Sequence, residues 1–242
     1  MGYYISFKKF RENIRMSEKT VNTVRERYKK ITRRINEEYW DSQSETDHSY
    51  YVGSYGRGTS IHASDIDVVV ILPNSIFKKF DSYSSNGQSS LLQDVKNKLR
   101  KTYPSSEIKG DGQVVSISFY DGIMFEIVPA FQRDFWSKEM TYPDTHDGGS
   151  WKLMDPLKEM DEFDELNSQT KGNLKRLCQM MREWNIENSV HQKGCLIDFA
   201  LFRYFKYYAG WFKSESYSYY GEYSNLKNSY KLKKAFLKVC RF

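Results

Sequence analysis

The sequence predicts a protein of the α+β class, in which a sheet follows a long N-terminal helix and a helical lobe follows the sheet. Three observations predict this order. Apolar residues recur every three or four positions near the N-terminus, alternate with polar residues in the middle of the chain, and return to helical spacing in the last third. We expect one lobe over residues 1–150, made of the first helix and the sheet, and a helical lobe over residues 151–242.

The first helix is predicted from a long amphipathic segment that contains neither Gly nor Pro. Charged residues fill the positions between its apolar residues, which are Val21, Val24, Tyr28, Ile31, Ile35 and Tyr39. The polar run from Asp41 to Ser49 separates this helix from Tyr50-Tyr51-Val52. These three residues predict a strand, which a Gly-rich turn connects to the apolar strand 65–72, and Pro73 ends that second strand.

The middle of the chain predicts a loop, a helix and a hairpin. The Ser-rich stretch from Asp81 to Ser90 is typical of an exposed loop. A helix follows, with apolar positions at Leu91, Leu92, Val95 and Leu99. Residues 115–119 and 123–127 then alternate between apolar and polar, with Asp121-Gly122 as the turn between them and Pro129 as the expected end of the second strand.

Two further helices are predicted in the last third of the chain. One carries Leu174, Leu177, Met181 and Trp184 on a single face, and the next carries Leu196, Ile197, Ala200, Leu201 and Tyr204. A Ser- and Tyr-rich loop from Ser214 to Asn225 follows. The chain then continues as a basic segment to Phe242.

Composition narrows the class of protein and of ligand. The 242 residues include 37 basic and 31 acidic ones, and the net charge of +6 favours polyanionic ligands such as nucleotides or nucleic acid. Cys178, Cys195 and Cys240 are too few and too unevenly spaced for a disulfide framework or a zinc site, so we expect reduced thiols in the core. No segment resembles a secretory h-region or approaches the ~20 apolar residues of a membrane span. We therefore expect a cytoplasmic protein that does not enter a membrane.

A Gly-rich segment, residues 53–59, precedes the apolar strand. Gly53, Gly56 and Gly58 allow positive φ angles and close approach of the backbone, so that N–H groups and the Ser54 hydroxyl can point at phosphate oxygens. Tyr55 either stacks on a base or fills the loop. Arg57 either contacts phosphate or is solvated.

Two aspartates stand at the start of the apolar strand. Asp65 and Asp67 are two residues apart, so their carboxylates project from the same face of a strand. Such a pair can bridge two divalent ions roughly 4 Å apart, which together activate an attacking hydroxyl and neutralise a leaving pyrophosphate. The alternative is a solvated turn before a buried strand, but the adjacent Gly-Ser loop favours the metal site.

Glu126 is the candidate for a third carboxylate. Phe125 and Ile127 would point to one face of their strand, and Met124, Glu126 and Val128 to the other. This pattern places a charge among apolar neighbours, where it needs compensation, and a metal ion would provide it. An exposed glutamate on a polar face remains the alternative.

These motifs resemble the polymerase-beta-like nucleotidyltransferase superfamily, and within it the bacterial cGAS/DncV-like enzymes, the CD-NTases of antiphage defence operons. The resemblance rests on Ser54 in Gly-Ser-Tyr-Gly-Arg-Gly-Thr, on Asp65-Ile-Asp67 and on Glu126-Ile-Val-Pro-Ala. The long helix before the motif, residues 151–156 and the helix ending Arg182-Glu-Trp-Asn add to it. The resemblance implies a nucleotide cleft between the sheet lobe and the helical lobe.

The resemblance also implies roles for individual residues. Ser54 would contact the donor triphosphate, Asp65 and Asp67 would hold two Mg²⁺ ions, for which Mn²⁺ can substitute, and Glu126 would position or deprotonate the acceptor hydroxyl. The chain departs from the family at three positions. Glu126 stands where relatives commonly have Asp, and Arg182 and Cys195 stand where the family places a Lys and a Ser on the triphosphate. Arg182 can pair with phosphate, whereas a Cys thiol is a weak donor.

The implied activity is template-independent synthesis of a cyclic dinucleotide or short cyclic oligonucleotide from ATP- or GTP-type ribonucleoside triphosphates, in bacterial antiphage defence. A regulatory protein from the same operon is an expected partner, and a nucleic-acid activator is left open. One alternative is nucleotidyl transfer to an RNA 3′ end, a protein or a small molecule. A third hypothesis is that the protein is a catalytically weak nucleotide-binding subunit.

Overall fold

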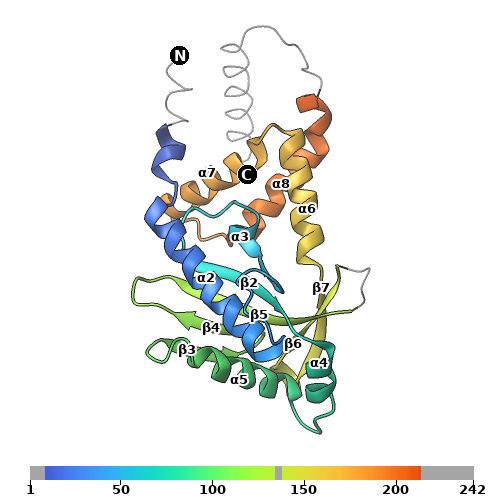
Figure 1. Ribbon diagram of the computed structural model, residues 1–242. Helices are drawn as coiled ribbons and strands as arrows, with labels where there is room; N and C mark the ends of the chain where they lie inside the picture. Colours follow the sequence, from blue (N-terminus) through green and yellow to red (C-terminus); the bar gives the residue numbers. More distant parts are fainter. Residues whose placement is uncertain (1–8, 134–137, 214–242) are drawn as a thin grey trace. The chain divides into compact units, whose positions relative to one another are not determined.

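The computed structural model describes residues 9–133 and 138–213. Its sheet is mixed, with strand order β1-β2-β5-β4-β3, and β6 and β7 extend from the far end of β5 (Figure 1). The strands are β1 Ser49–Tyr51, β2 Asp65–Ile71, β3 Glu107–Asp111, β4 Val114–Ser118, β5 Met124–Gln132, β6 Met140–Asp144 and β7 Ser150–Met154. The helices are α2 Glu18–Tyr39, α3 Gly53–Gly56, α4 Asn74–Asp81, α5 Gly87–Arg100, α6 Pro156–Gln169, α7 Asn173–Glu187 and α8 Gly194–Lys213. The α+β class predicted from the sequence is confirmed.

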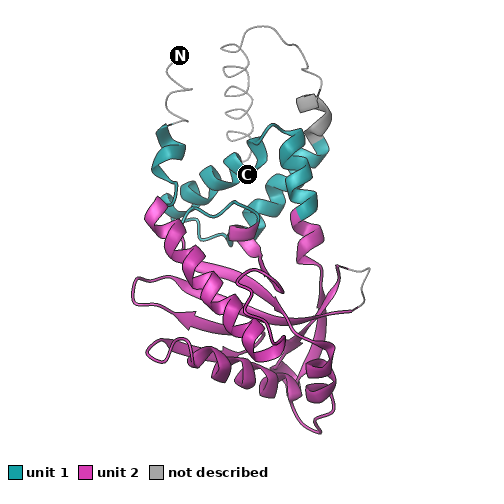
Figure 2. Cartoon of the chain, in the orientation of Figure 1, with its two compact units in different colours: residues 1–16, 57–62, 161–242 teal, residues 17–56, 63–160 magenta. Residues whose placement is uncertain are grey.

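The chain forms two compact units (Figure 2). We call residues 17–56 and 63–160 the sheet unit, and residues 1–16, 57–62 and 161–242 the helical unit. Each is described by itself below.

Helices α2 and α5 cover one face of the sheet and lie side by side (Figure 1). The predicted first helix is confirmed: Ser17 caps its start by accepting a hydrogen bond from the backbone N–H of Thr20. Its apolar stripe is buried against the sheet, together with that of α5, because both helices repeat apolar residues at three- and four-residue spacing. The buried apolar residues are Val24, Tyr28, Ile31 and Ile35 of α2, and Leu91, Leu92, Val95 and Leu99 of α5.

The predicted hairpin is confirmed, but Pro129 does not end its second strand. The turn between β4 and β5 is closed by a hydrogen bond from the Phe119 N–H to the Ile123 carbonyl, and β5 continues to Gln132. The last partners of β4 and β5 are Val115 and Ile127, so β4 has already ended beside Pro129. A proline is tolerated there because no strand on that side requires its missing N–H.

Several elements were not predicted. The Ser-rich stretch is a loop only over residues 82–86, because α4 ends at Asp81 and α5 begins at Gly87. Asn86 starts α5, since its side chain accepts a hydrogen bond from the Ser89 N–H. The Gly-rich turn contains the short helix α3. The remaining unpredicted elements are α4, β3, β6, β7 and most of α6.

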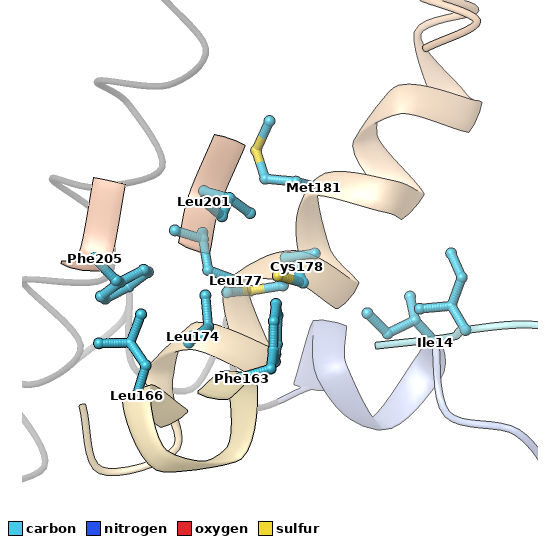
Figure 3. Packing of buried hydrophobic residues seen from close by; sticks show 11 residues of the cluster. Ile14, Phe163, Leu166, Leu174, Leu177, Cys178, Met181, Leu201 and Phe205 are labelled. Atoms are coloured by element: carbon cyan, nitrogen blue, oxygen red, sulfur yellow. The ribbon is translucent and has the colours of Figure 1, made fainter. Parts of the chain in front are cut away.

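The helical unit has its own apolar core (Figure 3). The predicted face of α7 is confirmed by the burial of Leu174, Leu177 and Met181. The predicted face of α8 is partly wrong: Leu196 is 55% exposed and Ala200 is also exposed, whereas the predicted Leu201 is buried, together with Phe205. The core residues are Ile14, Ile61, Phe163, Leu166, Leu174, Leu177, Cys178, Met180, Met181, Leu201 and Phe205.

The cysteines only partly match the prediction of core thiols. Cys178 is buried and free, whereas Cys195 is free and exposed. Burial raises the pKa of the Cys178 thiol well above its usual value, and the charge of Asp198 raises it further. Cys240, the Ser- and Tyr-rich loop and the basic C-terminal segment lie outside the described residues. No helix in the described part of the chain is both long and apolar enough to span a bilayer.

Candidate active site

Two of the three candidate carboxylates are direct neighbours in the sheet. Strands β2 and β5 are parallel, and their register pairs Asp67 with Glu126 and Asp65 with Met124. Paired residues of adjacent strands point to the same face and lie about 4.8 Å apart. The three carboxylates therefore share one face of the sheet, at the start of β2.

The same face is apolar further along both strands. Val69 and Ile71 follow Asp67 at two-residue intervals, and Ala130 follows Glu126. All three are buried in a cluster with Val52 and Met140. Asp65 is exposed and Asp67 and Glu126 are half-buried, so the carboxylates lie at the solvent-accessible end of this face.

Glu126 lies in an environment that disfavours its negative charge. Burial raises the pKa of the Glu126 carboxyl above its ordinary value, and the charge of Asp65 raises it further. The ionised side chain is accordingly less stable in the folded protein than in water. A cation at this position would offset both penalties by attracting the carboxylate.

We predict that Glu126→Gln makes the metal-free protein more stable at neutral pH. A carboxyl whose folded pKa is raised opposes folding wherever it is ionised, and this penalty disappears only as pH falls through the folded pKa. Glutamine removes the charge, so we expect Tm in the presence of a chelator to rise by about 2 °C. The matched control is Glu107→Gln on β3, where the side chain is 62% exposed and Tm should not change. An unchanged or lower Tm for Glu126→Gln would contradict the prediction.

The Gly-rich loop lies directly against Asp67. The Val52 N–H donates to the Asp67 carbonyl, and Gly53, with φ of 58°, begins α3. A Cβ atom on Gly53 would overlap Asp67 Oδ2 and come within 2.7 Å of Asp67 Cγ. Only glycine fits here without displacing the carboxylate. Ser54, the next residue, is therefore held close to the carboxylate-bearing end of β2.

Tyr55 packs against the sheet unit. Its ring lies 4.8 Å from the ring of Tyr51, which stacks on Tyr28 at 4.0 Å. Burial raises the pKa of the Tyr55 hydroxyl. Of the two roles considered from the sequence, these contacts favour filling of the loop.

Arg57 and Arg182 both bind one buried carboxylate of the helical unit. Arg57 is 5% exposed rather than solvated, and its Nη2 lies 3.1 Å from Oδ2 of Asp198. Arg182 donates from Nε to Oδ1 of Asp198 at 3.0 Å and from Nη2 to Oδ2 at 2.7 Å. Arg57 thus has a buried ionic partner, Asp198, which is neither phosphate nor solvent.

The guanidinium of Arg182, a residue of α7, also lies against the start of α8. Gly194 is the first residue of this helix, and a Cβ there would come within 2.6 Å of Arg182 Cζ. Cys195 follows Gly194 and is exposed. Arg182 and Cys195 are thus near one another, at the positive end of a helix dipole.

The donor set suits a hard divalent cation, although the carboxylates do not converge. Within residues 9–133 and 138–213, no group of three or more His, Cys, Asp or Glu side chains is arranged to hold a metal ion. The three carboxylates nevertheless offer only oxygen ligands, which Mg²⁺ and Mn²⁺ prefer. Burial and the charge of Asp65 raise the pKa of Glu126, and a bound cation would oppose both effects.

Sequence reasoning missed Asp198. The spacing of apolar residues could have indicated that Asp198 is buried. Leu201 and Phe205 follow it at three and seven residues, so Asp198 lies on the buried face of α8. A carboxylate at such a position needs buried cationic partners. Arg57 and Arg182 are such partners, but they are 141 and 16 residues away in the chain.

Comparison with known proteins identifies the family. Residues 1–167 match the model of the SMODS family, the Second Messenger Oligonucleotide or Dinucleotide Synthetase domain. A comparison with curated proteins found no match.

Solved structures share the fold. A STING-associated CdnE c-di-GMP synthase from Capnocytophaga granulosa has a TM-score of 0.58 and 15% identity, over 92% of this chain and 82% of that one. Elizabethkingia meningoseptica CdnE, a cyclic dinucleotide synthase solved with GTP and Apcpp, has a TM-score of 0.55 and 16% identity, over 82% and 72%. CdnC of E. coli MS115-1, solved with HORMA-deltaN, has a TM-score of 0.57 and 18% identity; 78% of this chain matches 59% of that one. At such identities the likeness establishes the fold alone.

Proposed function

The chain belongs to the SMODS family of cGAS/DncV-like nucleotidyltransferases, and from this premise we propose that it makes a cyclic dinucleotide or short cyclic oligonucleotide from ATP- or GTP-type substrates. Pyrophosphate is the second product of each transfer. The observation that carries the proposal is the register of β2 and β5, which makes Asp67 and Glu126 neighbours on the face that Gly53 approaches.

Asp65, Asp67 and Glu126 are the proposed ligands of two Mg²⁺ ions, which would neutralise the triphosphate and lower the pKa of the acceptor hydroxyl. Ser54 donates a hydrogen bond to the donor triphosphate. Glu126 orients the acceptor ribose and accepts its hydroxyl proton. The hydroxyl oxygen then bonds to the α-phosphorus while the bond to pyrophosphate breaks.

We propose that Arg182 and Cys195 contact the triphosphate. Support comes from the geometry of the helical unit, in which the Arg182 guanidinium lies against Gly194, the residue before Cys195. We also propose that residues 1–150 act as the catalytic lobe and residues 151–242 as the helical lobe of the enzyme.

Cys195→Ser is expected to strengthen substrate binding modestly. A hydroxyl donates a stronger hydrogen bond than a thiol, so KM for the triphosphate should fall by about twofold to fivefold with little change in kcat. The control is Tm, which should not change because Cys195 is exposed. A KM unchanged by Cys195→Ser would remove this residue from the site.

The proposal is tested by incubating the protein with the four labelled ribonucleoside triphosphates, with Mg²⁺ or Mn²⁺, and resolving the phosphatase-resistant products. A small resistant product that forms without RNA supports the proposal and identifies the bases. Products that appear only when RNA, protein or a small-molecule acceptor is added would support one of the alternative transferases. Nucleotide binding without any product would support the catalytically weak subunit.

We further propose a role in bacterial antiphage defence, in the cytoplasm, under the control of a partner protein. The support is indirect: the E. coli CdnC structure contains HORMA-deltaN. Repeating the product assay with proteins encoded beside this chain, and separately with double-stranded DNA or RNA, distinguishes a protein activator from a nucleic-acid activator. Equal rates in all these mixtures would count against regulation by either.

A further inference from the structure

One carboxylate of α8 joins two arginines of the helical unit. Asp198 is fully buried, and its Oδ2 accepts hydrogen bonds from Arg57 Nη2 at 3.1 Å and from Thr59 Oγ1 at 2.7 Å. Arg182 binds both oxygens of the same carboxylate. Two guanidinium groups and one carboxylate give these three side chains a net charge of +1, so Asp198 does not neutralise both arginines.

Arg182 is the arginine of the pair that reaches solvent. Its side chain is 15% exposed, compared with 6% for Arg57. Its Nε and Nη2 donate hydrogen bonds to Asp198. Its Nη1 forms no hydrogen bond within the described part of the chain. Arg182 therefore has one edge fixed by Asp198, while its Nη1 lies against Gly194 at the start of α8 without a hydrogen-bond partner in the described part of the chain.

We infer that Asp198 is a positioning residue for triphosphate binding, which holds Arg182 in the orientation that presents Nη1 to a phosphate oxygen. This inference rests on the proposed function of Arg182. The two bonds to Asp198 fix the plane of the guanidinium before substrate arrives. An arginine that is already ordered loses little conformational freedom on binding, so the triphosphate binds more tightly.

The same carboxylate also fixes the chain that follows the Gly-Ser loop. Arg57 comes directly after Gly56, the last residue of α3. Arg57 and Thr59 both bind Asp198, and the Gly58 carbonyl accepts a hydrogen bond from Gln179 of α7 at 3.2 Å. Asp198 therefore binds Arg57 and Thr59 as well as Arg182, all within the helical unit.

A purely structural ion pair would stabilise the fold without affecting substrate binding, and Asp198→Asn separates the two roles. The amide has the shape of the carboxylate but lacks its charge and one acceptor oxygen, so Arg182 loses its bidentate partner. We expect the dissociation constant for a non-hydrolysable ATP analogue to rise about tenfold. In turnover, KM should rise far more than kcat falls.

The control for loss of stability is Leu201→Ala on the same helix. Leu201 is fully buried and lies in the apolar core, so its truncation lowers Tm through a cavity and leaves Asp198 in place. Binding is measured at a temperature where both variants are folded. Leu201→Ala should keep the affinity of the wild type for the ATP analogue.

A second pair of variants keeps the test decisive if Asp198→Asn does not fold. Arg57→Met/Asp198→Asn retains the net charge of +1 on the three side chains, and Arg57→Met alone retains the bond between Asp198 and Arg182. The double variant should bind the ATP analogue about tenfold more weakly than Arg57→Met.

The inference also predicts coupling between Asp198 and Arg182. Once Arg182→Ala has removed the phosphate contact, adding Asp198→Asn should weaken binding no further. Additive effects, or wild-type affinity in Asp198→Asn, would overturn the inference. Failure of the proposed function has a different signature: the wild type itself would form no product. The binding measurements would then still decide the role of Asp198.

Discussion

Replacing Asp65 and Asp67 together by asparagine should reduce product formation by about a thousandfold or more. Both residues lie on one face of β2, and Asp67 is the register partner of Glu126. Asparagine keeps the size of each side chain but lacks the charge that holds a divalent cation. The measurement is the rate of formation of phosphatase-resistant product from labelled triphosphates, at saturating Mg²⁺ and at saturating Mn²⁺.

The matched control is Asp111→Asn on β3, an exposed aspartate of the same sheet that is expected to keep the wild-type rate. Melting temperatures of both proteins show whether the fold is retained. We expect the double variant to melt no lower than the wild type, because the charge of Asp65 opposes ionisation of Glu126. A double variant with more than about a tenth of the wild-type rate would exclude a catalytic role for the two aspartates.

Gly53→Ala should lower activity by about a hundredfold, although the new methyl group lies outside the set of proposed metal ligands. Its Cβ would overlap Asp67 Oδ2 and lie 2.7 Å from Asp67 Cγ, so either the carboxylate or α3 has to move. The φ of 58° adds a penalty of roughly 1–2 kcal/mol for a residue with a Cβ. Activity and Tm are measured together.

Gly58→Ala distinguishes the effect of backbone strain on activity from the effect of displacing the Asp67 carboxylate. Gly58 has φ of 67°, so alanine there carries a similar backbone penalty, but its Cβ would meet Lys175 Nζ at an ordinary 3.4 Å. Both variants should lose stability through backbone strain, and only Gly53→Ala should lose most of its activity. Equal losses of activity in the two variants would show that loop strain, and not displacement of Asp67, limits the reaction.

The long helix and the central strands could be predicted because local patterns specify them. Residues 18–39 repeat apolar side chains at helical spacing without a helix breaker, and residues 115–127 alternate around an Asp-Gly turn. Strands β3, β6 and β7 have weaker alternation and depend on neighbours in the sheet for their hydrogen bonds. Pro129 was misleading because a proline ends a strand only where its N–H would be needed, and that depends on where β4 ends.

By itself, the sequence determined which residues are available for chemistry: two aspartates on one strand face, a Gly-Ser loop before them and a glutamate among apolar neighbours. Their periodicity fixed the face of each strand, because side chains alternate along any strand. Tertiary structure decided which other residues these residues contact. The parallel register of β2 and β5 made Glu126 the neighbour of Asp67, and the fold buried Arg57 against Asp198, 141 residues away. Such contacts depend on how distant segments pack, which local sequence patterns do not encode.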